Sequence, residues 1–310
     1  MSANLVGFIG LGNMGYHMAK NIAQSGRAIV VYDVRTEAAE ALSDTENVVV
    51  AKSVKEVADR AETVLVSLPN AEIIENVAIG ENGLISGAAI KTYIDLSTSG
   101  EKAVQKISEK LAERGISSLD APVSGGPPGA KEGKLTIMVA GDKDLFDAKS
   151  DLLNALGKKI FYVSDSVGKA QIMKVINNLL SSAAMAISSE AVVLGVKAGL
   201  DPNLMIDVLN ASSGRNSATE DKFKKSIISR KFDWGFLSEL AYKDMKLCME
   251  VSEEYEVPMY LGTNITHFWR YAITQGAGKE DFTAIIKYFE DWAGIQVGES
   301  LKHEADAKGH

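Results

Sequence analysis

Short apolar runs alternate with segments of helical periodicity through the first half of the chain. Up to about residue 165 the apolar runs are LVGFIG, AIVVYD, TVLVSLP, TYIDLS and LTIMVAG. Runs of this length are typical of strands buried on both faces, and intervening segments such as EKAVQKISEKLAERG have the period of helices. The alternation predicts an α/β domain over residues 1–165, with a mostly parallel sheet covered by helices on both sides.

Helical segments without strands fill the second half of the chain. The run from residue 170 to about 198 has no proline and is apolar nearly all round, so we expect one long, buried connecting helix. Turn signals such as SSGRNS, EVP and QGAGKED separate further helical segments from Pro202 onward. We therefore predict an all-α domain over 166–300, which serves substrate binding and oligomerisation, and a polar tail over 301–310.

Composition narrows the kinds of partner. The 310 residues carry a net charge of −8, which argues against a nucleic-acid partner. The single cysteine, Cys248, excludes an intrachain disulfide and a multi-cysteine metal site, and we predict no metal. The N-terminal residues lack the pattern of a signal peptide, and we expect no apolar run to be long and clean enough to span a bilayer. These features predict a cytoplasmic protein with no membrane partner.

A glycine loop follows the first apolar run. Gly10, Gly12 and Gly15 have the spacing G-x-G-x-x-G between a predicted strand and a predicted helix, which is the context of a dinucleotide-binding fingerprint. The first glycine permits the tight turn, the second lets the backbone approach the pyrophosphate, and the third allows close helix packing. The phosphates then meet the free N–H groups of the helix N-terminus. The alternative is a glycine turn that binds no nucleotide. The predicted cofactor-binding residues of this Rossmann-like loop are Gly10, Leu11, Gly12, Asn13, Met14 and Gly15.

An acidic residue ends the next apolar run and indicates which dinucleotide is bound. Asp33 lies 18 residues after Gly15. A carboxylate there accepts hydrogen bonds from both ribose hydroxyls of the adenosine and repels a 2′-phosphate, which favours NAD. Arg35 leaves NADP open, because its guanidinium could pair with a 2′-phosphate.

Four stretches, in this order along the chain, carry a family resemblance. They are GFIGLGNMGYHMAKNI from Gly7, DAPVSGGPPGAKEGKLTIMVAG from Asp120, GKAQIMKVINNLL from Gly168 and YKDMKL from Tyr242. With these motifs the chain resembles the β-hydroxyacid dehydrogenases, the group that includes 3-hydroxyisobutyrate dehydrogenase, tartronate semialdehyde reductase and 2-(hydroxymethyl)glutarate dehydrogenase. The resemblance implies a Rossmann-like domain followed by a helical domain. It also implies an NAD(P)-dependent oxidoreductase that interconverts a small β-hydroxy acid and its semialdehyde.

The predicted reaction needs a base that takes the hydroxyl proton while hydride leaves the carbon. No histidine lies in a segment suited to this role. His17 is in the predicted cofactor helix, and His267 is in an apolar helical run, where we expect it to pack. His303 and His310 belong to the polar tail. The base must therefore be another residue type.

A polar stripe on the long helix supplies a candidate base. Its members fall at i, i+3, i+4 and i+7: Lys174, Asn177, Asn178 and Ser181. Apolar surroundings disfavour the charged form of Lys174, so we expect its pKa to fall toward the range useful for proton transfer. From the stripe alone, a lysine that reaches solvent and asparagines that join two helices are equally consistent. The resemblance implies that Lys174 is the general acid/base and that Asn178 is its partner.

A serine-glycine turn in the second stretch is a candidate substrate site. Ser124, Gly125 and Gly126 offer a hydroxyl and consecutive N–H groups, which form a nest for a carboxylate. The alternative is a tight turn that needs glycines for its backbone shape. Arg215, in the segment SSGRNSATE, could bind a second carboxylate bidentately, and a surface arginine is an equal alternative.

Further cofactor contacts are implied by the resemblance alone. They are Leu68, Pro69, Asn70, Thr98 and Lys243. Asp244, beside Lys243, would either orient Lys174 or pair locally, and solvated charges on a helix are the alternative for both.

The third stretch also departs from the family pattern. The family reads Gly-x-Gly-x-x-x-Lys, and Ala170 replaces the second glycine here, with Lys169 adding a charge. We expect a less flexible turn, which bears on substrate identity more than on the chemistry.

Two other functions are considered. One is an enzyme of the same fold that acts on an imine or on a phosphorylated sugar acid such as 6-phosphogluconate. Recognition of a phosphate would need several basic residues beside the substrate turn, and only Lys131 and Lys134 lie near it, so the sugar acid is disfavoured. The other is a non-catalytic NAD-binding protein, against which Lys174 argues. The apolar long helix further predicts a homo-oligomer, a dimer or tetramer.

Overall fold

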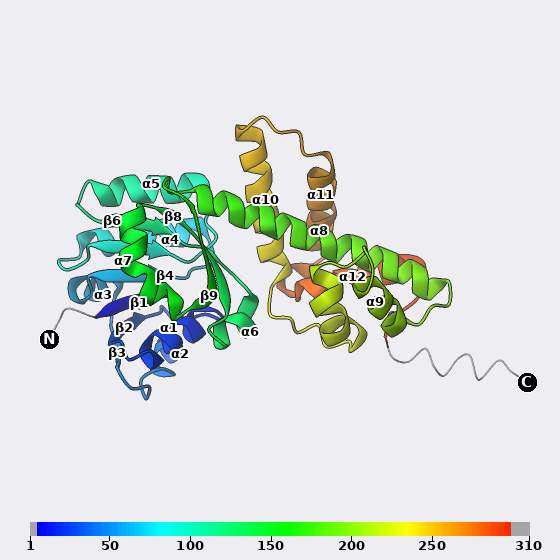
Figure 1. Ribbon diagram of the computed structural model, residues 1–310, viewed down its shortest axis with the longest axis horizontal. Helices are drawn as coiled ribbons and strands as arrows, with labels where there is room; N and C mark the ends of the chain where they lie inside the picture. Colours follow the sequence, from blue (N-terminus) through cyan, green and yellow to red (C-terminus); the bar gives the residue numbers. More distant parts are fainter. Residues whose placement is uncertain (1–4, 299–310) are drawn as a thin grey trace, which may run out of the picture. The chain divides into compact units, whose positions relative to one another are not determined.

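The computed structural model describes residues 5–298. The chain divides into two compact units, Met1–Val175 and Ile176–His310 (Figure 1). The predicted tail 301–310, with His303 and His310, lies outside the described residues.

The first unit is built on a nine-stranded sheet in the order β3-β2-β1-β4-β5-β6-β8-β7, with β9 beside β8. The pairs from β3 to β6 are parallel, whereas β8 runs antiparallel to β6 and β7 and parallel to β9. The predicted fold class, a mostly parallel Rossmann-like sheet, is confirmed. The strands are β1 (Val6–Ile9), β2 (Ile29–Tyr32), β3 (Val48–Val50), β4 (Thr63–Val66), β5 (Thr92–Asp95), β6 (Ser117–Asp120), β7 (Val123–Ser124), β8 (Leu135–Gly141) and β9 (Gly157–Ser164).

Helices cover both faces of this sheet (Figure 1). Alternate residues of a strand point to opposite faces, so Phe8 packs in one apolar cluster and Ile9 in the other. The first cluster contains residues of α1 (Gly15–Gln24), α2 (Thr36–Glu40), α6 (Gly126–Lys131) and α7 (Lys143–Asn154). The second contains residues of α3 (Val54–Arg60), α4 (Ala71–Ile79) and α5 (Glu101–Ala112). Burial of each large aliphatic side chain contributes about 1.5–3 kcal/mol to this packing.

Side-chain caps define where several of these helices begin. Ser53, Asn70 and Asp142 each accept a hydrogen bond from a backbone N–H in the first turn of α3, α4 and α7, respectively. Each cap satisfies one donor that the helix leaves unpaired and is worth about 1 kcal/mol.

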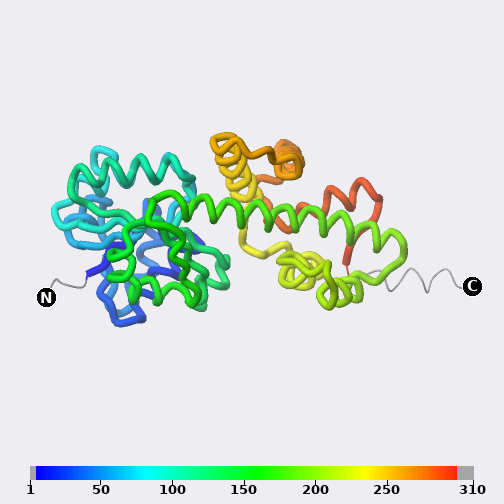
Figure 2. Tube along the Cα trace, turned by 45° about the horizontal axis from the view of Figure 1, so that its top comes forward, coloured from blue at the N-terminus to red at the C-terminus, as the bar shows by residue number. Residues whose placement is uncertain are grey.

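The second unit is helical, which agrees with the predicted helical C-terminal domain. Its α10 and α11 lie side by side (Figures 1 and 2), and a methyl group built on Gly262 of α11 would come 3.0 Å from Met249 Cε of α10. His267 of α11 is exposed, so the expectation that it packs is wrong. The elements are α8 (Lys169–Lys197, which begins in the first unit), α9 (Pro202–Asn210), a π-helix (Ala218–Ile228), α10 (Ser238–Glu254), α11 (Tyr260–Thr274), 3-10 turns (Ala277–Lys279 and Phe282–Ile285) and α12 (Ile286–Ala293).

The long helix α8 differs from two expectations. It is not buried all round, because Ile176, Leu180, Ile187 and Leu194 expose apolar side chains. Contrary to the expectation of no such run, its 29 residues are also long and apolar enough to cross a bilayer by length and composition. Of its most apolar window, 56% is buried inside the protein, as in the core helices of globular proteins.

Candidate active site

The parallel strands bring their carboxyl ends to one edge of the sheet, where ligands bind in open α/β folds. The loops that leave β1, β2, β4, β5 and β6 therefore start at this edge. These loops contain the predicted cofactor residues of the first unit and lead into the predicted substrate turn.

The glycine loop has no room for a side chain at its first and last glycines. Gly10 has a φ of +92°, and a Cβ there would lie 2.2 Å from the carbonyl oxygen of Ser67. A Cβ on Gly15, the first residue of α1, would lie 1.8 Å from the carbonyl oxygen of Gly10. At Gly12, by contrast, a Cβ would meet no atom within 4 Å. The loop thus needs glycine at its two ends for packing, and it faces open space at Gly12, where a ligand would approach.

Asp33 lies at the end of β2 and is bound to this glycine loop. Its Oδ2 accepts a hydrogen bond from the backbone N–H of Leu11 at 2.6 Å, and its Oδ1 accepts one from the N–H of Arg35 at 2.9 Å. Partial burial works to raise the pKa of Asp33, but the N–H donors and the Arg35 guanidinium outweigh it and lower that pKa. Asp33 is therefore an ionised acceptor beside the loop.

Arg35 pairs with Asp33 at the same place. Its Nε lies 3.3 Å from Asp33 Oδ1, while 61% of its side chain remains exposed. The guanidinium is thus held next to the carboxylate and is still accessible to a ligand.

The loops after β4 and β5 are joined to each other. The N–H of Leu68 donates to Ser97 Oγ at 2.9 Å, and Thr98 follows, half-buried. Asn70 Oδ1 accepts from the N–H of Ile73 at 3.0 Å, so this side chain caps α4. The structure therefore places Leu68, Pro69 and Thr98 on neighbouring loops, and it gives the side-chain oxygen of Asn70 a structural partner.

The predicted substrate turn lies between β7 and α6. Ser124 ends β7, opposite Thr136 of β8. Gly125 and Gly126 have φ values of +132° and +62°, and α6 begins at Gly126 with prolines in its first turn. The left-handed backbone at these two positions accounts for the glycines by itself, so it is also consistent with the alternative of a tight turn that binds no substrate.

The polar stripe on α8 contains the predicted catalytic residues. Lys174 is buried, with 7% of its surface exposed, and Asn178 lies one turn further along the helix. Asn178 Nδ2 donates to Asp244 Oδ2 at 2.6 Å, and its Oδ1 accepts from Asn177 Nδ2 at 3.0 Å. Asp244 also pairs with Lys243 at 3.2 Å, so Asp244 makes a local pair and orients Asn178.

The two residues that depart from the family pattern, Lys169 and Ala170, lie at the start of α8. Gly168 has a φ of +101°, which favours glycine, whereas Ala170 lies inside the helix and is fully buried. A second glycine is therefore not needed for the turn, and the expected effect of Ala170 on turn flexibility has no basis in this backbone. Lys169 Nζ lies 2.8 Å from Glu101 Oε1, which ties the first residue of α8 to the first residue of α5.

Arg215 lies in an exposed loop of the second unit. Its Nε is 3.5 Å from Glu220 Oε1, and 63% of its side chain is exposed. This position favours the alternative of a surface arginine over a carboxylate anchor.

Sequence reasoning missed the buried polar residues that join the motifs. Asp120 and Gln171 are both fully buried, and Gln171 Nε2 donates to Asp120 Oδ1 at 2.7 Å. Asp95, the register partner of Asp120 on β5, accepts from the N–H of Ser97 at 2.8 Å. A signal was present, because Gln171 precedes Lys174 by three residues and so extends the polar stripe.

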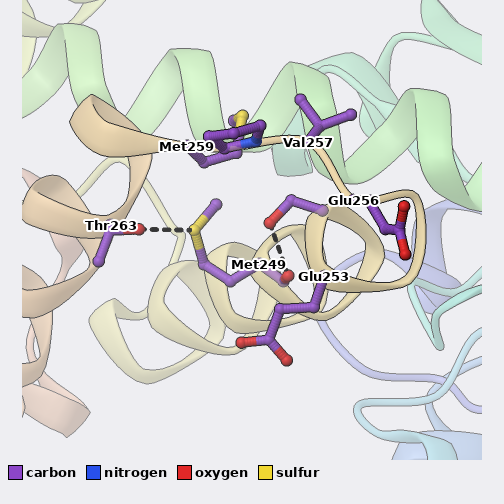
Figure 3. Close-up of a pocket in the computed structure, with 8 residues that line it drawn as sticks. Met249, Glu253, Glu256, Val257, Met259 and Thr263 are labelled. Carbon is purple, nitrogen blue, oxygen red and sulfur yellow. Dashed lines mark hydrogen bonds between the residues drawn. The ribbon is translucent and has the colours of Figure 1, made fainter.

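A hollow of about 340 Å³ lies elsewhere, at the turn between α10 and α11 (Figure 3). Thr263 Oγ1 donates to Met249 Sδ across it at 3.8 Å. None of the predicted site residues lines it, and its glutamates do not suit a carboxylate-bearing substrate, because like charges repel. Its lining residues are Met249, Ser252, Glu253, Glu256, Val257, Pro258, Met259 and Thr263.

Two other features bear on the chemistry. Among residues 5–298, no group of three or more His, Cys, Asp and Glu side chains is placed to hold a metal ion. Cys248 is a buried free thiol whose pKa is raised by burial, so it does not have the character of a nucleophile.

Both parts of the chain match known protein families. Residues 5–164 match the family described as the NAD binding domain of 6-phosphogluconate dehydrogenase, and residues 168–289 match the NAD-binding family of NADP-dependent 3-hydroxyisobutyrate dehydrogenase. The 2-(hydroxymethyl)glutarate dehydrogenase of Eubacterium barkeri is 38% identical over 94% of this chain and 97% of its own length. Mitochondrial 3-hydroxyisobutyrate dehydrogenase of Mus musculus is 33% identical over 92% of this chain and 87% of its own. The structure of Mycobacterium tuberculosis 3-hydroxyisobutyrate dehydrogenase with L-serine is 27% identical, with a TM-score of 0.82 over 92% of this chain and 98% of that one.

Proposed function

Because the chain belongs to the β-hydroxyacid dehydrogenase family, of the 3-hydroxyisobutyrate dehydrogenase type, and is an NAD(P)-dependent oxidoreductase that acts on hydroxyl groups, we propose that it interconverts a small β-hydroxy acid and its semialdehyde. The observation that carries this proposal is the buried Lys174, one turn before Asn178 on α8. A buried lysine favours its neutral form and can then act as a base.

A bound nicotinamide cofactor would supply the acceptor for the hydride that leaves the substrate carbon during oxidation. Lys174 takes the hydroxyl proton at Nζ in this direction and returns it to the carbonyl oxygen during reduction. It must therefore be neutral before oxidation and charged before reduction. Asn178 positions the reacting oxygen, and its amide is oriented for this by the hydrogen bond to Asp244.

The serine-glycine turn supports a substrate that carries a carboxylate. We propose that Ser124, Gly125 and Gly126 bind the substrate carboxylate through a hydroxyl and backbone N–H groups. A second anchor at Arg215, for a dicarboxylate such as 2-(hydroxymethyl)glutarate, is not supported by its exposed pairing with Glu220.

The cofactor is proposed to be NAD rather than NADP. The support is the ionised Asp33, whose carboxylate lies beside the glycine loop and would repel a 2′-phosphate. Leu68, Pro69, Asn70, Thr98 and Lys243 are proposed as the remaining cofactor contacts, on the basis of the family resemblance.

The exposed face of α8 supports a homo-oligomer. Ile176, Leu180, Ile187 and Leu194 recur at intervals of four and seven residues, which gives a continuous apolar stripe suited to a second copy of this chain. Sedimentation of the wild type and of Leu180→Glu tests this, and a wild-type monomer would contradict it. We also propose a cytoplasmic location, supported by the lone free Cys248, which gives no disulfide suited to an oxidising compartment.

The function is tested by absorbance at the NADH band. Purified protein is mixed with NAD, and separately with NADP, and 3-hydroxyisobutyrate, glycerate, serine, 4-hydroxybutyrate, threonate or 2-(hydroxymethyl)glutarate. We expect turnover with at least one β-hydroxy acid and preference for NAD. Binding of NAD without turnover on any of these acids or their semialdehydes would overturn the proposed substrate class.

A further inference from the structure

The side chain of Gln171 makes four hydrogen bonds inside the first unit. Its Oε1 accepts from the N–H of Ser99 at 2.9 Å and from the N–H of Gly100 at 3.2 Å. Its Nε2 donates to the carbonyl oxygen of Ser97 at 3.1 Å and to Asp120 Oδ1 at 2.7 Å. The amide therefore uses both its acceptor sites and both its donors, while it is completely buried.

These bonds join three separate stretches of the chain. Residues 97–100 form the loop after β5, and Asp120 ends β6, just before the proposed substrate turn. Gln171 itself lies in the first turn of α8. Asp120 Oδ2 also accepts from the backbone N–H groups of Gly168 and Gln171, both at 3.1 Å, so the carboxylate fixes the start of the helix as well.

Lys174 follows Gln171 by three residues on the same helix. Residues three apart lie on one face of a helix. The hydrogen bonds that fix the position of Gln171 therefore fix the rotation of α8 about its axis and its position along that axis, and with them the position of Lys174. A displacement of about 1 Å at a reacting group can lower the rate about 100-fold.

We propose that Gln171 is a positioning residue, which holds the first turn of α8, and with it Lys174, in place against the loop 97–100 and the end of β6. This inference rests on the proposed role of Lys174 in proton transfer. A glutamine suits the position because it can accept two N–H groups from one loop while it donates to a carbonyl and to a carboxylate. A glutamate has no N–H to donate, and methionine has neither group.

Gln105 provides a matched control. Its Nε2 donates to Glu101 at 3.3 Å and to the carbonyl oxygen of Val167 at 3.4 Å, so it also links α5 to the segment before α8. Neither of these two hydrogen bonds involves Ser97, Ser99, Gly100 or Asp120. Gln105→Met removes the same chemical group from the same unit and leaves the Gln171 bonds intact.

The test compares the wild type with Gln171→Met and Gln105→Met, all as full-length protein with NAD and the acid that the wild type oxidises. We expect Gln171→Met to lower kcat by about 10- to 100-fold and to displace the pH profile of kcat, which reports the acid/base group in the bound complex. We expect KM and the NAD dissociation constant to change far less than kcat. Gln105→Met should keep the wild-type kcat and pH profile.

Hydrogen exchange gives a readout that does not depend on turnover. Exchange at the amides of Ser99 and Gly100 should accelerate in Gln171→Met and stay unchanged in Gln105→Met. If Gln171→Met does not fold, Gln171→Glu replaces it, because it keeps both acceptor bonds and loses both donor bonds, and the same fall in kcat is expected.

The outcomes separate the two proposals. An active wild type with unchanged kcat and pH profile in the Gln171 variant would overturn the positioning role alone. Unchanged exchange at Ser99 and Gly100 in Gln171→Met would overturn it too. A wild type that binds NAD and oxidises none of the hydroxy acids would instead overturn the proposed function, and the inference with it.

Discussion

Asp120 in the sheet unit and the buried carboxylates Asp244 and Glu290 in the helical unit are held by different kinds of partner. In the sheet unit, Asp120 accepts hydrogen bonds from two backbone N–H groups and one amide. In the helical unit, Asp244 pairs with Lys243, and Glu290 pairs with Arg230. Neutral donors shape loops around a carboxylate without adding a cation, whereas a cation leaves a buried charge uncompensated when it is removed.

Because these partners differ, we expect mutations of the partners to have different effects in the two units. Loss of a neutral donor in the sheet unit should change the geometry of the ligand edge and the pKa of the carboxylate. Loss of a cation in the helical unit should lower the free energy of unfolding. Lys174 is the informative case in the sheet unit, because it is a buried lysine for which we propose a chemical role.

The largest effect is expected for Lys174→Met. If Lys174 is present for chemistry rather than for charge pairing, kcat should fall by about 100- to 10,000-fold, because general acid/base catalysis is lost. NAD affinity, measured by titration, should persist, because the proposed role of Lys174 is transfer of the substrate proton.

Lys197→Met is the control for this prediction. Lys197 lies at the far end of the same helix and donates to the carbonyl oxygen of Ala293 at 2.7 Å. The Lys197→Met variant should retain the wild-type kcat. A wild-type kcat in Lys174→Met would show that this lysine has a structural role and does not take part in proton transfer.

The helical unit is tested by Arg230→Ala. Arg230 binds both oxygens of the buried Glu290, and Glu290 also accepts from the N–H of Val297 at 2.7 Å. Removing the guanidinium leaves the carboxylate without its cation, which should cost about 3–5 kcal/mol in urea unfolding.

Lys287→Ala is the matched control, because its pair with Glu280 is exposed on both sides. An exposed pair is worth about 0–1 kcal/mol, so this variant should unfold close to the wild type. Equal losses in the two variants would show that burial does not distinguish these pairs.

The sheet unit is tested next by Asp33→Asn. The variant keeps the shape of the side chain and loses the charge that we propose accepts the ribose hydroxyls. Hydrogen bonds to a charged group are worth about 1.5–3 kcal/mol, so NAD affinity should fall about 10- to 100-fold and the preference over NADP should shrink. Asp59→Asn, on the surface beside Lys55, should bind NAD as the wild type does. Unchanged cofactor selectivity in Asp33→Asn would assign selectivity to another residue.

Local patterns in the sequence predicted the parts of the fold that depend on neighbours along the chain. The glycine loop, the Asp33 position and the length of α8 follow from spacing and periodicity within short segments. The bonds of Gln171 to Ser99 and Asp120 cross 72 and 51 residues of sequence, so no local pattern reports them. The exposed stripe on α8 was mispredicted for a related reason, because apolar composition does not tell which face meets the protein. The antiparallel direction of β8 likewise depends on pairing with β6, and an apolar run is the same in either direction.

The smallest predicted effect is a pH dependence that originates at Asp120. Burial is the main cause that raises the pKa of Asp120 to about 7, with a contribution from Asp95, against the hydrogen bonds from Gln171 and Gly168. The folded protein therefore binds this proton where the unfolded chain, with a pKa near 3.8, has lost it. The contribution of Asp120 to stability must then fall as the pH rises through this window, up to the folded pKa.

Between pH 6 and 8 this fall amounts to about 1.4 kcal/mol for one group that titrates near 7. Asp120→Asn should be destabilised by an amount that does not change with pH, because its amide group meets an N–H donor. Its free energy of unfolding should therefore lack the fall that the titration of Asp120 causes in the wild type. The difference in unfolding free energy between the wild type and Asp120→Asn should thus shrink by about 1.4 kcal/mol from pH 6 to pH 8. Asp59, whose pKa is lowered mainly by its hydrogen bond from Lys55, titrates entirely below this range, so Asp59→Asn should run parallel to the wild type. A constant difference between the wild type and Asp120→Asn would mean that the neutral donors hold Asp120 ionised at pH 6.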